Sequence, residues 1–214
     1  MLQQSLAREA FTVIAVAMES RGSKAAREWI ERAQPTYPCL IDRAHLVSDL
    51  YHMTNVPQAV WIDEHGRIAR PCETAGASSS RDMAKRTEVR EFYCEAVRDW
   101  VRHGEASRYH LDAAGLASHA PPMTEEIAQA HVCFRLGQHL WDGGDREQAL
   151  PLLLRASELS PDSWNMFRQM KNLEHVAGSA GPEFMARVQE FLAAGKRYYP
   201  APDMPGITEI YTKK

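Results

Sequence analysis

The chain has 214 residues, of which 44% are hydrophobic and 25% charged, a composition typical of one large or two small globular domains. Its formal net charge of −3 gives no electrostatic reason to expect binding to nucleic acid or to an anionic membrane surface, so both partner classes are disfavoured. The longest apolar run near the N-terminus, Phe11 to Met18, is too short to span a bilayer, and a cytoplasmic location is the expectation.

Apolar runs alternate with helical patterns in the first quarter of the chain. Phe11 to Met18 predicts a buried strand, and Ser23 to Ala33 predicts a helix with Ser23 as its N-cap. Residues 39–41 predict a second strand, which ends at Asp42. Apolar residues then recur at helical spacing over 46–51, which predicts the covering helix that a parallel crossover requires.

The next stretch predicts a β-hairpin introduced by a proline. Residues 60–62 are a β-prone apolar run, Asp63 to Gly66 has turn chemistry, and residues 67–69 can return antiparallel. Pro57 has no N–H to donate to a sheet, so it is expected at the first residue of the strand or on an edge.

The composition changes after the hairpin. Residues 71–87 contain a Gly/Ser-rich segment with mixed charges and predict a mobile loop. Residues 88–103 recover an amphipathic helix that Gly104 ends, and residues 104–123 are expected to form a linker.

One 34-residue unit, Ala130 to Ser163, resembles a tetratricopeptide repeat. Leu136, Gly137 and Leu140 fall on its first helix, Gly144 in the turn, and Ala149, Leu153 and Ala156 on its second helix. A single repeat cannot bury its own apolar face, so flanking helices are expected to complete a four-helix array over residues 124–197. The Pro-interrupted tail, 198–214, is expected to be extended.

The order of strand, helix, strand, helix and proline-led hairpin over residues 1–103 resembles the thioredoxin fold. Within that fold it is most similar to redoxins of the TlpA/ResA type and to peroxiredoxin-related proteins. The resemblance implies that the Val56–Pro57 bond is cis and that Val56, Pro57 and Gln58 contact an extended substrate by β-augmentation. It also implies that residues 1–10 are the tail of the helix that carries the family's Cys-x-x-Cys motif.

No Cys-x-x-Cys motif occurs in the sequence, so no catalytic residue is predicted, and the chain is expected to be a degenerate redoxin or a truncated product. The four cysteines, Cys39, Cys72, Cys94 and Cys133, have no metal or redox spacing. Cys72 lies in the predicted loop and is the candidate for a reactive thiol. The nine histidines form no His-Glu-x-x-His motif, and neither a metal nor another cofactor is predicted.

These patterns predict an α/β thioredoxin-like sheet with covering helices at 1–103, joined by the 104–123 linker to an all-α repeat-like domain at 124–197 and the 198–214 tail. Two functions fit them. The first is a redox-inactive relative of the thiol-disulfide oxidoreductases. The second is a protein-interaction or scaffold module that uses the repeat groove and the surface around Pro57. Because the resemblance implies an absent strand beside Phe11 to Met18, the open edge is expected to be covered by a second copy of the chain, by a separate partner or by the chain's own C-terminal region, with a homodimer as the first choice.

Overall fold

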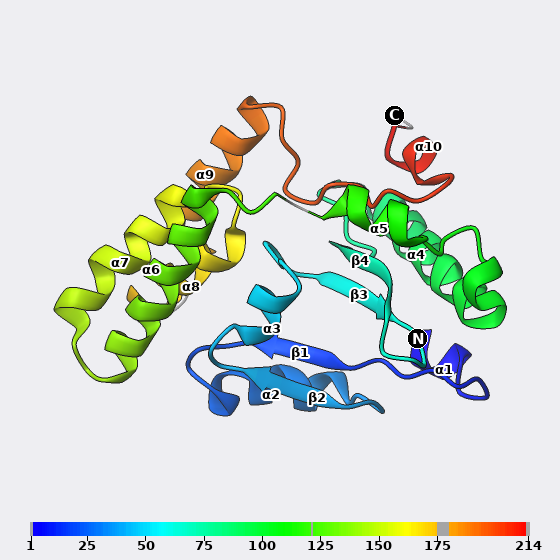
Figure 1. The fold of residues 1–214 in the computed structure, drawn as a ribbon, viewed down its shortest axis with the longest axis horizontal. Helices are drawn as coiled ribbons and strands as arrows, with labels where there is room; N and C mark the ends of the chain where they lie inside the picture. The colour runs from blue at the N-terminus through cyan, green and yellow to red at the C-terminus, as the bar shows by residue number, and fades with distance from the viewer. Residues whose placement is uncertain (1, 121, 175–179, 213–214) are drawn as a thin grey trace. The chain divides into compact units, whose positions relative to one another are not determined.

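The computed structural model describes residues 2–120, 122–174 and 180–212 and is a mixed α/β structure (Figure 1). Its internal contacts divide the chain into two compact units. The first unit contains residues 2–13, 56–120 and 191–212, and the second contains 14–55, 122–174 and 180–190. Each unit therefore combines stretches that are far apart in the sequence, which differs from the contiguous division into 1–103 and 124–197 predicted above.

The second unit contains a parallel pair of short strands. β1 (Ala15–Met18) pairs with β2 (Cys39–Asp42), with Ala15 opposite Cys39 and Met18 opposite Asp42. β1 begins later than the predicted strand, which was placed from Phe11. Helix α2 (Ser23–Ala33) connects the strands as expected, although its N-cap is Gly22 and no side chain caps it, so the prediction for Ser23 was wrong.

Helix α3 (Leu46–Leu50) follows β2 in the second unit. The Asp42 carboxylate accepts hydrogen bonds from the backbone N–H groups of Leu46 and Val47, at 3.0 and 2.7 Å. The last residue of the strand thereby satisfies two of the donors that the first turn of a helix leaves open.

Four longer helices of the chain match the predicted array: α6 (Glu125–Asp142), α7 (Arg146–Leu159), α8 (Trp164–Glu174) and α9 (Pro182–Ala193). The hydroxyl of Thr124 caps α6 by accepting the N–H of Ile127. Helices α6 and α7 cross at Gly137, where an added Cβ would lie only 2.8 Å from Leu153 Cγ. The small residue is thus required by the close approach of the two helices, as the sequence pattern predicted.

Hydrogen bonds from helix α8 connect the helices to the rest of the second unit, which contains β1 and β2. The backbone N–H of Asn165 donates to the carbonyl of Thr54 at 3.0 Å, and its side chain donates to the carbonyl of Met53 at 2.8 Å. Asn165 is buried. These contacts tie the first turn of α8 to the chain segment that follows α3.

The first unit is built on the predicted hairpin. β3 (Gln58–Ile62) and β4 (Ile68–Thr74) pair antiparallel, and the Asp63 carboxylate holds the turn by accepting the N–H groups of His65 and Arg67 at 2.9 and 2.8 Å. β4 extends to Thr74, so the predicted loop at 71–87 was wrong over its first four residues. The following helix, α4 (Met83–His103), begins five residues earlier than predicted because Asp82 caps it.

The core of the first unit lies between the hairpin and α4. The Trp61 indole N–H donates to the Tyr93 hydroxyl at 2.8 Å, and the Trp61 ring stacks on Trp100 with centroids 5.2 Å apart. Leu6, which follows α1 (Leu2–Ser5), and Ile207 are buried in the same cluster. Both N-terminal and C-terminal segments therefore contribute to this core.

The predicted linker and tail contain helices. The linker includes a short 3-10 helix, η1 (Gly104–Ala106), and α5 (Ala113–His119), and the tail includes α10 (Ile207–Thr212). The prediction that 198–214 is extended was therefore wrong for α10. The physical reason is burial, because the side chains of Met204 and Ile207 are 3% and 2% exposed.

A buried arginine joins the hairpin to this tail. Arg70 on β4 is 1% exposed, and its guanidinium donates to both carboxylate oxygens of Glu73, at 2.9 and 3.0 Å. It also donates to the carbonyls of Tyr109 and Asp203. A buried charge is stable only when it is paired and hydrogen-bonded, and here four acceptors satisfy it.

Candidate functional site

The predicted substrate-contacting residues lie together at the start of the hairpin. The Val56–Pro57 peptide bond is cis, which confirms the expectation. Val56 and Pro57 are exposed and Gln58 is half-buried, opposite Thr74 in the sheet. The carbonyl of Pro57 accepts the N–H of Ala75 at 3.1 Å, which fixes this end of the hairpin. Two exposed apolar side chains, Val56 and Pro57, therefore directly precede β3.

The structure argues against Cys72 as a reactive thiol. Cys72 lies within β4 and not in a loop, and its side chain is only partly exposed. Burial, with a smaller contribution from the nearby carboxylate of Glu73, raises the pKa of Cys72 to about 12. Since the thiolate is the nucleophilic form, this environment suppresses its reactivity.

The other cysteines lie on different elements. Cys39 is on β2, Cys94 on α4 and Cys133 on α6, and all four cysteines are free thiols. Burial raises the pKa of Cys94. Over the described ranges, no group of three or more His, Cys, Asp or Glu side chains is placed to bind a metal ion. The described helices also include none that is both long and apolar enough to cross a membrane.

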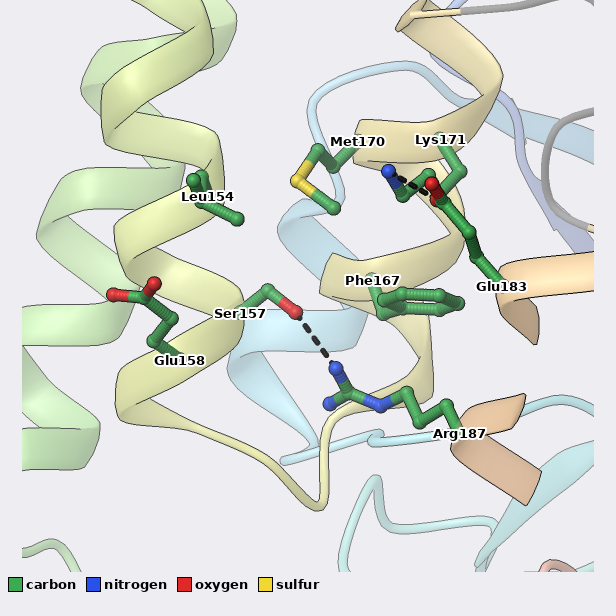
Figure 2. Close-up of a pocket in the computed structure, with 8 residues that line it drawn as sticks. All are labelled: Leu154, Ser157, Glu158, Phe167, Met170, Lys171, Glu183 and Arg187. Carbon is green, nitrogen blue, oxygen red and sulfur yellow. Dashed lines mark hydrogen bonds and ion pairs between the residues drawn. The ribbon is translucent and has the colours of Figure 1, made fainter. Parts of the chain in front are cut away.

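A pocket that the sequence did not indicate lies between α7, α8 and α9 of the second unit (Figure 2). Its volume is about 260 Å³. Leu154, Phe167 and Met170 form its apolar lining, and Leu154 is 50% exposed at its mouth. Five polar side chains complete the lining: Ser157, Glu158, Lys171, Glu183 and Arg187.

Arg187 stabilises one wall of this pocket, as Figure 2 shows. Its guanidinium lies over the Phe167 ring, 4.5 Å from the centroid, and over the Trp164 ring at 5.5 Å. It donates to Ser157 Oγ at 3.0 Å and to the carbonyl of Pro161. Burial lowers the pKa of Arg187 from its usual value. These contacts connect α9 with α7 and α8.

Lys171 is paired on the opposite wall. Its ammonium group lies 2.8 Å from the Glu174 carboxylate and 2.5 Å from the Glu183 carboxylate. Hydrogen bonds to these two carboxylates raise the pKa of Lys171 against the effect of partial burial. Because both cations of the pocket already have partners in the protein, the pocket offers apolar surface more than a site for an anionic ligand.

The sequence could not identify this pocket, although it predicted the three helices. Phe167, Met170 and Lys171 share one face of α8, and Glu183 and Arg187 share one face of α9 at i, i+4 spacing. Helical periodicity marks such faces but does not say which faces converge.

Comparison with known proteins adds no assignment, because no family model, curated protein or solved structure matches this chain.

Proposed function

We propose that this chain is a redox-inactive relative of the thioredoxin-fold redoxins that binds polypeptides, with repeat-like helices supplying the main binding surface. The pocket between α7, α8 and α9 is the observation that carries this proposal. An apolar side chain of the bound polypeptide enters it as an anchor, next to Leu154, Phe167 and Met170.

The size and chemistry of the pocket support an amino-acid side chain as its occupant. Its volume of about 260 Å³ lies below the roughly 300–1,000 Å³ typical of sites for small molecules and cofactors. Anchors of protein interfaces are apolar or aromatic side chains that fill such pockets, surrounded by polar groups that exclude water. Ser157, Glu158 and Glu183 provide polar groups around the apolar lining.

The relation to redoxins is supported by the order of elements. A parallel strand pair connected by a helix is followed by a short helix and an antiparallel hairpin, although the two strand pairs form separate sheets instead of the single predicted sheet. In the redoxins the surface at the proline contacts extended substrates, so Val56, Pro57 and Gln58 form the second contact surface of the proposal.

The thiols support the absence of redox activity. The 214 residues contain no Cys-x-x-Cys motif, and the pKa values of Cys72 and Cys94 are raised. A thiol-disulfide oxidoreductase needs a thiolate with a lowered pKa. Catalysed reduction of insulin should therefore not exceed that of a variant in which all four cysteines are replaced by serine. A higher rate for the native chain would contradict this half of the proposal.

The binding half is tested by selecting peptides from a random library displayed on phage. Leu154→Ser polarises the mouth of the pocket at a side chain that is 50% exposed, so little stability should be lost. Leu136→Ser is the matched control, because Leu136 on α6 is 45% exposed and does not line the pocket. Selected peptides should bind the native chain and Leu136→Ser equally and bind Leu154→Ser at least tenfold more weakly. Equal binding to all three, or failure to select any peptide, would refute the pocket as the binding site.

The proposal includes self-association. Among the described strands, β1 pairs only with β2, so a second copy of the chain is the expected partner at its other edge. Sedimentation velocity at micromolar concentration should give a dimer, and a monomer throughout that range would rule this out.

A further inference from the structure

Polar side chains from four parts of the second unit meet near the carboxyl ends of β1 and β2. Ser20 follows β1, His45 precedes α3, Gln138 lies on α6 and Gln169 lies on α8. The side chains of His45, Gln138 and Gln169 are 1%, 8% and 7% exposed, and Ser20 is half-buried. The carboxyl ends of parallel strands are the usual location of binding sites in open α/β sheets.

Ser20 Oγ has two hydrogen-bond partners in this cluster. It lies 3.2 Å from His45 Nε2, and it accepts an N–H from Gln138 Nε2, also at 3.2 Å. Because an amide N–H can only donate, the hydroxyl hydrogen of Ser20 stays available for the imidazole. In the tautomer that carries its hydrogen on Nδ1, His45 Nε2 accepts the hydroxyl hydrogen of Ser20.

Gln169 is placed to orient the other side of the ring. Its amide nitrogen donates to the carbonyl of Met18 at 3.2 Å, which fixes the side chain at the end of β1. His45 Nδ1 and Gln169 Oε1 are both buried and lack hydrogen-bond partners among the described residues. The Gln169 side chain nevertheless acts on the imidazole, because it raises the pKa of His45 against the larger effect of burial.

The charges around His45 leave the imidazole neutral near pH 7. Burial lowers the pKa of His45, while the carboxylates of Asp42, Asp49 and Glu19 act weakly in the opposite direction. Each of these carboxylates is engaged elsewhere: Asp42 caps α3, Asp49 pairs with His131 and Arg135, and Glu19 pairs with Arg21. A neutral imidazole can accept a proton, as general base catalysis requires.

The position of Ser20 in the chain also suits a nucleophile. It lies in the turn from Glu19 to Gly22 between β1 and α2, closed by a hydrogen bond of 2.9 Å from the Gly22 N–H to the Glu19 carbonyl. Gly22 has a φ of 83°, which favours glycine. Serine hydrolases often carry their nucleophile in such a strand-to-helix turn, with glycines two residues before and after it. Met18 replaces the first glycine here, so the match is partial.

We propose that Ser20 is a nucleophile activated by His45 and that this site hydrolyses small carboxylic esters. Gln138 is a positioning residue that holds the Ser20 hydroxyl by donating an N–H to its oxygen. Gln169 is a positioning residue that orients the imidazole, as an amide does in some cysteine hydrolases. This activity is independent of the polypeptide binding proposed above.

The reaction has two stages. Ser20 Oγ attacks the ester carbonyl carbon while His45 Nε2 takes the hydroxyl proton, and the carbonyl oxygen becomes the oxyanion of a tetrahedral intermediate. Collapse of this intermediate breaks the bond to the alcohol, which leaves with the proton from His45, and the acyl group stays on Ser20. Water then attacks the acyl carbon, again with His45 as base, and releases the carboxylic acid and the free Ser20 hydroxyl.

The direct test is labelling with a small alkyl fluorophosphonate, followed by mass spectrometry of the digested protein. The phosphonyl group should be found on Ser20, and His45→Gln should slow the labelling roughly 100-fold or more, the usual contribution of a general base. Ser48→Ala is the matched control. Its hydroxyl, in the same unit, donates to the Met53 carbonyl and accepts an N–H from Asn165, so labelling should be unchanged.

Two measurements keep the proposal testable if His45→Gln does not fold. Gln169→Leu should alter the pH profile of labelling, because it changes the orientation and protonation of the imidazole. Ser20→Ala should abolish labelling at this site and reduce the hydrolysis of p-nitrophenyl acetate to the spontaneous rate. Absence of label on Ser20 in the folded native chain, or labelling that is equal in folded His45→Gln, would overturn the proposal.

Discussion

Replacement of Gly137 by alanine tests the close crossing of α6 and α7. The added Cβ would lie 2.8 Å from Leu153 Cγ, 3.0 Å from its Cδ2 and 3.2 Å from the carbonyl oxygen of Ala149. Leu153 is fully buried and Ala149 contributes backbone, so neither can move without repacking. Overpacking costs about 1–3 kcal/mol, against a helix-propensity gain of about 1 kcal/mol. We expect a net loss of roughly 1 kcal/mol.

Urea denaturation followed by circular dichroism measures this loss, with Gly143→Ala as the control. Gly143 ends α6 in a right-handed conformation, and the nearest contacts of its added Cβ are 3.4 and 3.5 Å, so this variant should be no less stable than the native chain. In a Leu153→Ala background the cost of Gly137→Ala should shrink, because the two nearest atoms are gone and only the Ala149 carbonyl oxygen, at 3.2 Å, stays close. A Gly137→Ala protein as stable as Gly143→Ala would contradict the close approach of α6 and α7 at Gly137.

Three further predictions concern single side chains. Cys72 in the folded chain should react with iodoacetamide at pH 8 roughly a thousandfold more slowly than an ordinary thiol, because its pKa is raised to about 12, and equal rates in native and urea-unfolded protein would contradict this. Burial lowers the pKa of His45 below 6.5, so as the pH falls the imidazole is protonated in the unfolded chain before it is protonated in the folded chain. Stability should therefore fall as pH drops below about 6.5, and less so in His45→Gln, as urea midpoints at pH 7.5 and 5.5 would show. Arg70→Met removes the ion-pair partner of the Glu73 carboxylate, whose side chain is only 10% exposed, and should cost about 3–5 kcal/mol. The control Arg67→Met, at a side chain 62% exposed, should cost under about 1 kcal/mol, and similar losses for the two variants would be inconsistent with a shielded Arg70–Glu73 pair.

Local signals predicted much of the fold. The turn residues from Asp63 to Gly66 marked the hairpin, and the helical spacing at 23–33 matched α2 at both ends. Gly137 marked the helix crossing because only glycine permits that approach. In each case the deciding interaction lies within one element or between neighbours in the chain, where periodicity and turn chemistry carry the information.

Long-range contacts explain what the sequence did not reveal. The Gly/Ser-rich composition of residues 71–87 suggested a loop that includes Cys72, because the sequence does not show that Arg70 and Glu73 form an ion pair within β4. Asn165 links α8 to a segment more than 100 residues earlier, which changes the division into units. Ser20, His45, Gln138 and Gln169 come from four separate parts of the chain, and no spacing rule in the sequence connects them.

The most direct test of polypeptide binding is a methyl-selective NMR titration of the native chain with a peptide selected from the library. The account predicts that the methyl groups of Leu154 and Met170 shift with one dissociation constant and that Leu154→Ser removes the shift of Met170. A peptide that binds with no change at either methyl group would contradict the pocket as the binding site.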